Sequence, residues 1–236
     1  MPPIISVEGL TKSYGHHNVL DNISFSFQPG QIIGLLGPNG CGKTTLIKVL
    51  TGLIKDYEGK VYIDGREPGV TSKALIAFMP DKSYIPDWMN PVQAVNYIAD
   101  FFADFDKEKA LEMVDRFGLP RKQKMKSMSK GMKEKLLLIL VMSRNAKLYI
   151  LDEPLGGVDP AARSFILDII MNNYAKDSTV LLSTHLINDV ERIFNSVLMI
   201  DRGNIVVNSS VDDIRNSGKT VEDVFKEVFG YAWQVD

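Results

Sequence analysis

The hydrophobic residues of this chain recur with two different periods. Ile23, Phe25 and Phe27 alternate with Ser24 and Ser26, which is the pattern of a strand that buries only one face. Other apolar runs are nearly continuous, which is typical of strands that are covered on both faces. We expect strands at residues 23–27, 31–36, 59–65, 149–151, 179–182, 197–200 and 205–207.

Helical patterns separate these strands. Residues 43–50 predict a helix that ends before Gly52. Asn90 fits an N-cap, because Pro91 follows at the first helical position and Gln93 completes a capping-box pattern. Further helices are expected at about 159–174 and at 221–229.

Strands that alternate with helices predict an α/β fold around a parallel sheet. The alternation is interrupted once, at about residues 88–145, where only helices are predicted. We therefore expect a single domain over residues 1–236, with a helical subdomain at about 88–145 and a short C-terminal tail at about 211–236.

Aromatic residues mark the predicted helical subdomain. Tyr97, Phe101, Phe102 and Phe105 recur at helical spacing. Such a stripe is more typical of core packing than of a binding surface. We therefore expect these side chains to pack in the core of a small helical lobe.

Composition narrows the class of protein. The chain is 45% hydrophobic and 24% charged, which is ordinary for a globular domain. Its 27 basic and 29 acidic residues leave a net charge of -2, which disfavours a protein that coats nucleic acid. A single cysteine fits a reducing compartment. Because no secretory signal is visible and no apolar run approaches the ~20 residues that span a bilayer, we expect no membrane-spanning segment.

The strongest chemical signal is a glycine-rich loop between a predicted strand and a predicted helix. Its sequence matches G-x-x-x-x-G-K-[ST], in which glycines let backbone N–H groups approach phosphate oxygens. The helix N-terminus adds partial positive charge, Lys43 reaches the β- and γ-phosphates, and Thr44 can ligate Mg²⁺. The expected nucleotide contacts are Gly37, Pro38, Asn39, Gly40, Cys41, Gly42, Lys43, Thr44 and Thr45.

Two consecutive carboxylates follow the apolar run that ends at Leu151. Adjacent strand residues point to opposite sides, so Asp152 and Glu153 are expected to have different tasks. We assign Asp152 to the water shell of a metal ion, and Glu153 to the attacking water as general base.

In this order, the motifs resemble those of the ATPase subunits of ATP-binding-cassette (ABC) transporters. The resemblance runs from about residue 4 to residue 210. It includes the run Met-Ser-Lys-Gly-Met at 128–132, which is similar to the LSGGQ signature loop of the family. The resemblance implies a P-loop NTPase core with a parallel sheet, an N-terminal antiparallel β subdomain and an inserted α-helical subdomain.

The resemblance also implies that ATP is bound between two such subunits. Each signature loop then faces the phosphate loop of the partner, where Ser129 and Gly131 contact the γ-phosphate. Read without the family, the same segment is an ordinary helix cap.

Other family positions match single residues. Tyr14 matches the aromatic residue that stacks on adenine, Asp159 the loop that crosses the dimer interface, and His185 the histidine at the γ-phosphate. Each has a plainer alternative: a packed strand-end aromatic residue for Tyr14, a helix N-cap for Asp159 and a polar strand end for His185.

Two places depart from the family. Asp81 stands where Gln is usual, although its carboxylate can still offer an oxygen to Mg²⁺. The signature run has Lys130 in place of the first Gly and Met132 in place of Gln.

The resemblance implies an enzyme that binds ATP and Mg²⁺ and hydrolyses ATP to ADP and phosphate. Its implied partners are a second ATPase subunit and a separate membrane-spanning permease, with no nucleic acid. The subunit would be cytoplasmic and peripheral, held at the inner face of the cell membrane through the permease. Asp81 and the short tail after Gly203 most resemble bacterial exporter-type subunits, so we expect export.

Two alternatives share part of this motif set. One is a soluble single-domain ABC ATPase that is not coupled to transport, for example in iron–sulfur cluster assembly, and membrane association would discriminate it. The other is a nucleic-acid machine. DNA-repair relatives insert a long coiled coil between phosphate loop and signature, and translation-type members carry two cassettes in one chain, so both are disfavoured.

Cys41 lies inside the phosphate loop. Its plain role is that of a small residue in a position often held by Ser. Because a helix N-terminus and Lys43 both favour a thiolate, we also expect Cys41 to be more reactive than a free cysteine. A maleimide would then inactivate the enzyme, and MgATP would protect it.

Overall fold

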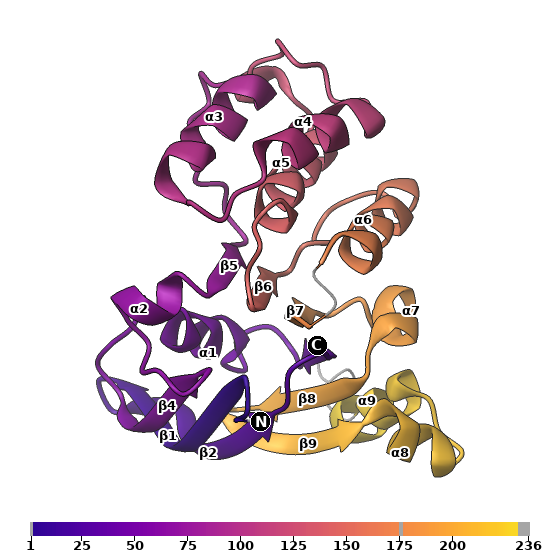
Figure 1. Cartoon of the computed structure of the whole chain (residues 1–236). Helices are drawn as coiled ribbons and strands as arrows, with labels where there is room; N and C mark the ends of the chain where they lie inside the picture. Colours follow the sequence, from indigo (N-terminus) through magenta and orange to yellow (C-terminus); the bar gives the residue numbers. More distant parts are fainter. Residues whose placement is uncertain (1, 175–176, 231–236) are drawn as a thin grey trace.

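Two β-sheets organise the molecule, and Figure 1 shows the smaller one at the lower end. The computed structural model describes residues 2–174 and 177–230. The smaller sheet is antiparallel and has the strand order β2-β1-β4. Its strands are β1 (Ile5–Tyr14), β2 (His17–Phe27) and β4 (Glu58–Ile63). Burial alternates along the end of β2 as its sequence predicts.

The larger sheet has six strands in the order β5-β6-β7-β3-β8-β9. The neighbouring pairs are parallel, except that β9 runs antiparallel to β8. The strands are β3 (Ile32–Leu36), β5 (Ile76–Met79), β6 (Leu148–Asp152), β7 (Thr179–Thr184), β8 (Ser196–Asp201) and β9 (Asn204–Ser210). In β3, β6 and β7 every residue is buried, which confirms the predicted double coverage.

Helices occupy the predicted connections. Asn90 caps α3 as expected, because its side chain accepts a hydrogen bond from the backbone N–H of Gln93. The α-helices are α1 (Lys43–Leu50), α2 (Val70–Lys73), α3 (Pro91–Phe101), α4 (Lys107–Arg116), α5 (Lys130–Met142), α6 (Pro160–Asn173), α7 (Ile187–Val190), α8 (Val211–Asn216) and α9 (Val221–Phe229). Short 3-10 turns lie at Met125–Ser127 and Glu191–Ile193. The last part of the predicted tail, residues 231–236, lies outside the described residues.

The larger sheet separates two hydrophobic cores. Ile33 and Leu35 of β3 face one core, which they share with α1 and the smaller sheet. Ile32 and Leu36 face the other, which they share with α3 to α9. This alternation follows from the two-residue period of a strand. It places the C-terminal ends of the parallel strands between the two cores, where a ligand site is expected.

Helices α3, α4 and α5 form the upper part of Figure 1. Phe102 and Phe105 pack against the core as the sequence predicts. The prediction is wrong for Tyr97 and Phe101, which are 38% and 66% exposed. The reason is the helical period, because the buried stripe of α3 runs through Ala94, Val95 and Ile98 and leaves the next stripe uncovered.

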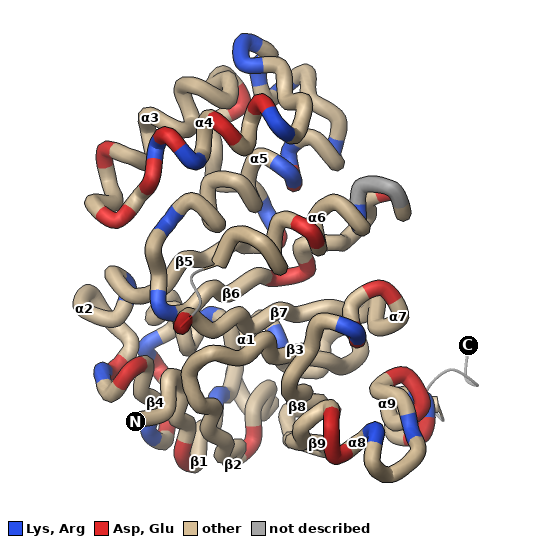
Figure 2. The backbone as a smooth tube through the Cα atoms, turned by 45° about the vertical axis from the view of Figure 1, so that its right-hand side comes forward, with Lys and Arg blue, Asp and Glu red and all other residues tan. Residues whose placement is uncertain are grey.

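Charged positions of both signs are spread over most of the backbone in Figure 2. Two basic residues of the helical part form ion pairs with nearby acidic residues: Arg121 pairs with Asp115, and Lys133 pairs with Asp87. Within residues 2–174 and 177–230, no helix is long and apolar enough to cross a bilayer.

Candidate nucleotide-binding site

Residues of several polar motifs line one pocket. It lies at the phosphate loop, the end of β6 and the segments that follow β5 and β7, as the position of strand ends in an open α/β sheet predicts. The described residues that line it are Val19, Asn39, Gly40, Gly42, Lys43, Thr44, Thr45, Asp81, Asp152, Glu153, Gly156 and His185.

The phosphate loop needs glycine for close approach at two positions. A Cβ on Gly37, whose φ is +151°, would collide with the carbonyl oxygen of Ile200. A Cβ on Gly42 would lie 2.8 Å from the carbonyl oxygen of Val19, and its φ of +118° disfavours other residues. The loop is therefore held tightly between β2 and β8.

The N-terminus of α1 is open toward the pocket. Gly42 is its N-cap and has no side chain with which to cap the first N–H groups. Thr44 is exposed and Thr45 half-buried at this end. Uncapped N–H groups and the helix dipole together favour an anion such as phosphate.

Lys43 is buried and turned onto its own loop. Its Nζ donates hydrogen bonds to the carbonyl oxygens of Gly37, at 2.7 Å, and Pro38, at 3.0 Å. It also lies 4.0 Å from Oε1 of Glu153. The ammonium is therefore kept at the base of the pocket, next to the general-base candidate.

The end of β6 is fixed by a serine of the neighbouring strand. Ser183 Oγ donates to Oδ1 of Asp152 at 2.7 Å and accepts from the backbone N–H of Glu153 at 2.9 Å. Asp152 is buried, and this bond orients its carboxylate. Ser183 was not predicted from the sequence, although its place at the end of a predicted strand, two residues before His185, is a usable signal.

The different tasks expected of Asp152 and Glu153 stay a prediction. Both line the same pocket, because β6 ends at Asp152 and strand alternation no longer applies to the next residue. Glu153 has a φ of +51°, a left-handed conformation that is uncommon for a side-chain-bearing residue. Such conformations cluster at functional sites, where surrounding contacts maintain them.

Glu153 and His185 are in direct contact. Nδ1 of His185 lies 3.0 Å from Oε2 of Glu153, and His185 is exposed toward the pocket. The carboxylate thus has His185 on one oxygen and Lys43 near the other. The geometry suits a base whose position is set before substrate arrives.

The oxygen donors of the pocket suit Mg²⁺. Thr44, Asp81 and Asp152 contribute a hydroxyl and two carboxylates to the lining of the pocket, and Mg²⁺ prefers such ligands together with phosphate oxygens and water. The described residues hold no cluster of three acidic, His or Cys side chains that could bind a metal alone. These ligands fit an ion that the protein and a bound nucleotide coordinate together, rather than an ion that the protein coordinates alone.

Seven predicted contacts are not among the described residues that line the pocket, and three of them, Gly37, Pro38 and Cys41, belong to the phosphate loop itself. The other four come from other segments. Ser129, Gly131 and Asp159 are not among the described residues that line the pocket, and neither is Tyr14. Ser129 is the exposed N-cap of α5, where its Oγ accepts from the N–H of Met132 at 3.3 Å. Tyr14 is 53% exposed at the end of β1. The pocket of one subunit therefore lacks its signature-loop residues.

The expected reactivity of Cys41 is contradicted. Cys41 is only 5% exposed, packs in the core beneath α1 and does not line the pocket. Burial raises the pKa of the Cys41 thiol, and this effect outweighs the lowering by nearby Lys43. Its role is that of a small core residue.

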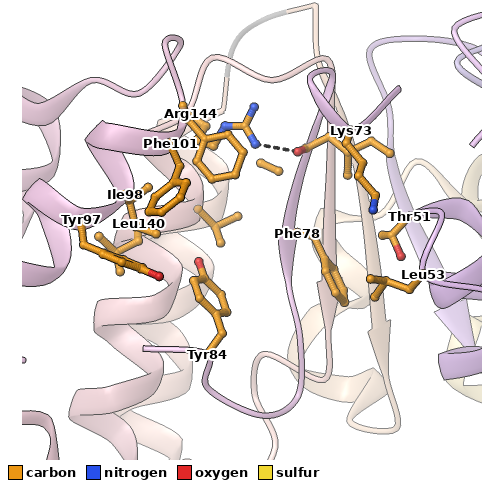
Figure 3. Close-up of a pocket in the computed structure, with 14 residues that line it drawn as sticks. Thr51, Leu53, Lys73, Phe78, Tyr84, Tyr97, Ile98, Phe101, Leu140 and Arg144 are labelled. Atoms are coloured by element: carbon orange, nitrogen blue, oxygen red, sulfur yellow. Dashed lines mark hydrogen bonds between the residues drawn. The ribbon is translucent and has the colours of Figure 1, made fainter. Parts of the chain in front are cut away.

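A second hollow is apolar and lies beside β5 (Figure 3). Phe78 and Leu53 form one wall, and Tyr97 and Phe101 of α3 form the opposite wall. The Arg144 guanidinium lies at one end, where it donates to the carbonyl oxygen of Ile76 at 2.8 Å. We call this hollow the β5 groove. Its lining residues are Thr51, Leu53, Lys73, Ile76, Ala77, Phe78, Tyr84, Tyr97, Ile98, Phe101, Phe102, Leu140, Val141 and Arg144.

Comparison with known proteins identifies the family. The ABC transporter family model matches residues 20–156. The uncharacterized ABC transporter ATP-binding protein YdbJ of Bacillus subtilis is 35% identical, over 96% of this chain and 74% of YdbJ. The lantibiotic transport ATP-binding protein SrtF of Streptococcus pyogenes is 27% identical, over 90% of this chain and 93% of SrtF.

Solved structures share the fold. An ATP-binding subunit of an ABC transporter matches 95% of this chain and 98% of its own, with a TM-score of 0.84 and 25% identity. The cassette MJ0796, solved as a dimer in a post-hydrolysis state bound to ADP and Pi, covers 87% of this chain and 98% of its own, with a TM-score of 0.77 and 20% identity. The predicted α/β cassette fold is thereby confirmed. The chain belongs to the ABC transporter family, as an ATP-binding subunit that hydrolyses ATP.

Proposed function

We propose that two copies of this subunit, or one copy and a similar subunit, close around ATP and drive transport through a separate permease. The observation that carries the proposal is the division of the site. The phosphate loop, Asp152 and Glu153 line one pocket, whereas Ser129 and Gly131 of the same chain lie outside it. A second subunit that presents its signature loop completes the pocket, as the dimeric state of MJ0796 supports.

Within this pair, each residue has a separate task in hydrolysis. Lys43 leaves the carbonyl oxygens of its loop for the β- and γ-phosphates. Glu153 accepts the proton of the attacking water, and His185 holds that carboxylate while facing the γ-phosphate. Asp159 and the partner's signature loop meet across the interface, and the exposed ring of Tyr14 stacks on adenine.

Thr44, Asp152 and Asp81 would hold Mg²⁺ with the phosphate oxygens. When bound, the ion neutralises phosphate charge. Asp152 is oriented by Ser183, whereas Asp81 is exposed, so Asp81 is the weaker ligand. Asp81→Asn should raise the Mg²⁺ concentration for half-maximal ATPase activity about threefold, with a smaller change in nucleotide affinity, because it removes one charge near the ion.

The β5 groove is the docking site for the permease in this proposal. Leu53, Tyr84, Tyr97 and Phe101 are each at least 38% exposed there, and exposed apolar surface of this kind marks a contact with another molecule. An amphipathic helix from the cytoplasmic side of the permease fits such a groove. Lys73 is exposed at the rim, so an acidic residue on that helix would complement it.

We assign the subunit to the cytoplasm, peripheral to the inner face of the membrane through the permease. We further propose that transport is export. Two features support this direction: Asp81 in place of the usual Gln, and the similarity to SrtF, a lantibiotic transport ATP-binding protein.

Capture from native membranes tests the transport proposal. A tagged chain is solubilised in mild detergent, and a membrane protein with several spans should copurify with the wild type. The variant Phe101→Glu, which places a charge in the β5 groove, should lose that protein while it keeps basal ATPase activity. Recovery of the active wild type from the soluble fraction alone would favour the ABC ATPase that is not coupled to transport.

A further inference from the structure

Arg163 connects two segments that flank the nucleotide pocket. It lies in the first turn of α6, directly after Val158 and Asp159. We call these two residues the Asp159 turn. Its Nε donates to the carbonyl oxygen of Val158 at 2.9 Å, and its Nη1 donates to Oδ2 of Asp189 at 2.8 Å. Asp189 belongs to α7, which begins two residues after His185. One guanidinium therefore bridges the Asp159 turn and the helix that follows His185.

The segment after His185 is held by core packing and by a few polar contacts. Ile187 and Val190 of α7 are buried in the hydrophobic core that α3 to α9 share. Helix α7 has only four residues, and a helix of one turn is not stable without outside contacts. The N–H of Leu186 donates to Oγ1 of Thr184 at 3.0 Å, which fixes the strand end. On the far side, the N–H of Glu222 in α9 donates to Oε2 of Glu191 at 3.3 Å. Between these two hydrogen bonds, the ion pair with Arg163 adds a further polar restraint on α7.

The chemistry of arginine suits this bridge. A guanidinium is planar and donates in several fixed directions, so one side chain can hold two acceptors at once. The side chains of Arg163 and Asp189 are 24% and 39% exposed, so the ion pair is partly shielded from water. Such a pair restrains position even where its contribution to stability is small.

We infer that Arg163 is a positioning residue for ATP hydrolysis, which holds His185 against Glu153 through Asp189 and ties this contact to the Asp159 turn. The inference rests on the roles proposed above for His185 and Asp159. If the partner subunit presses on the Asp159 turn when the pair closes, Arg163 passes that displacement to the segment that carries His185. Hydrolysis then depends on closure, although Arg163 does not contact the nucleotide.

Steady-state kinetics of the purified intact chain test this inference. Arg163→Ala and Asp189→Ala should each lower kcat about tenfold to a hundredfold, because small misplacements of a catalytic group have effects of this size. The KM for MgATP should change less than about twofold, since the phosphate loop is untouched. Asp189→Asn keeps an acceptor oxygen and should retain more activity than Asp189→Ala.

The double variant gives a second readout. If both residues act through one bridge, Arg163→Ala combined with Asp189→Ala should be no slower than Arg163→Ala alone. The matched control is Arg192→Ala, which removes an exposed arginine three residues from Asp189 and leaves both hydrogen bonds of Arg163 in place. The control should keep wild-type turnover.

Thermal unfolding of each variant separates folding from positioning. Loss of turnover in a variant that unfolds at the wild-type temperature supports the bridge. Wild-type kcat in Arg163→Ala or Asp189→Ala, or multiplicative losses in the double variant, would overturn it. His185→Ala is measured in parallel. Full activity there would reject the proposed role of His185 itself, whereas a slow His185→Ala beside an active Arg163→Ala would reject only the role of Arg163.

Discussion

The nucleotide pocket and the β5 groove are built in opposite ways. In the pocket, polar side chains are tied to one another: Ser183 bonds to Asp152, and His185 contacts Glu153. In the groove, Tyr97 and Phe101 leave much of their aromatic surface in water. A satisfied polar network is organised before its ligand arrives, whereas exposed apolar surface is stabilised only when another molecule covers it. The first arrangement suits chemistry, and the second suits docking.

Strand β5 joins the two regions. Its residues Ile76, Ala77 and Phe78 line the groove, and Asp81, which follows it, lines the pocket. Tyr84, which is three residues after Asp81, again lines the groove. A helix docked in the groove, as proposed, would therefore contact the same short segment that lines the nucleotide pocket. Substitutions that affect one region and spare the other measure how independent the two regions are.

The largest effect is expected in the pocket. Glu153→Gln keeps the shape of the side chain and removes the base, so kcat should fall by about 10³-fold or more. ATP binding should persist, because the phosphate loop is unchanged, and the paired state should accumulate with MgATP. Lys43→Ala is the contrasting variant and should weaken nucleotide binding itself. Near wild-type hydrolysis by Glu153→Gln would remove Glu153 from the mechanism.

Substitutions in the β5 groove should weaken the binding of the permease rather than the hydrolysis of ATP. Replacement of Tyr97 and Phe101 by Ala should weaken the complex with the permease about tenfold to a hundredfold, since large aromatic residues dominate interfaces. Basal ATPase activity in detergent should stay within about twofold of wild type, because neither residue lines the pocket. Val206→Ala is the control, because Val206 is a 43% exposed apolar residue of β9 outside the groove. Equal weakening by the control would mean that the groove is not the docking surface.

Substitution of Glu134 in α5 should have an effect of intermediate size, on the free energy of unfolding, and this effect should depend on pH. Burial raises the pKa of Glu134 from 4.5 to about 7, against a lowering by nearby Lys130 and with a smaller raising contribution from Asp81. An acid whose pKa is raised on folding destabilises the protein increasingly from pH 4.5 to about 7, and by a constant amount above that. Glu134→Gln should therefore be more stable than wild type by roughly 1–2 kcal/mol at pH 8, with allowance for solvent screening of a half-buried group.

Denaturant unfolding at pH 4 and pH 8 provides the measurement for Glu134. The stability difference between the variant and the wild type should largely vanish at pH 4, where the side chain is mostly protonated in both states. A difference of the same size at both pH values would show that packing, not ionisation, is responsible.

Cys41 should show the smallest functional effect. Because burial raises its pKa and covers its sulfur, the native protein should react with a maleimide at least about tenfold more slowly than the unfolded protein. Cys41→Ser should keep its ATPase activity and lose about 1 kcal/mol of stability, because a hydroxyl replaces sulfur in the core. Rapid labelling of the native protein that MgATP suppresses would instead place the thiol in the pocket.

The sequence by itself determined the family, the order of strands and helices and the polar residues of the pocket. Lys43, Thr44, Asp152 and Glu153 could be predicted because each residue type has one main use beside a phosphate, and their spacing places them at strand ends. The limits of α1 and α9 were also predicted correctly, because the hydrophobic period agrees with the stop at Gly52 after α1 and with the cap at Thr220 before α9.

Only the tertiary structure decided which apolar residues stay uncovered and where single side chains point. Tyr97 and Phe101 have the same pattern as core residues, and their exposure depends on where β5 and α5 lie relative to α3. Cys41 faces the core, and Glu153 reaches His185 from a left-handed backbone conformation. Arg163 reaches Asp189, 26 residues away. Such outcomes depend on contacts between distant segments, which the local period and spacing of a sequence do not encode.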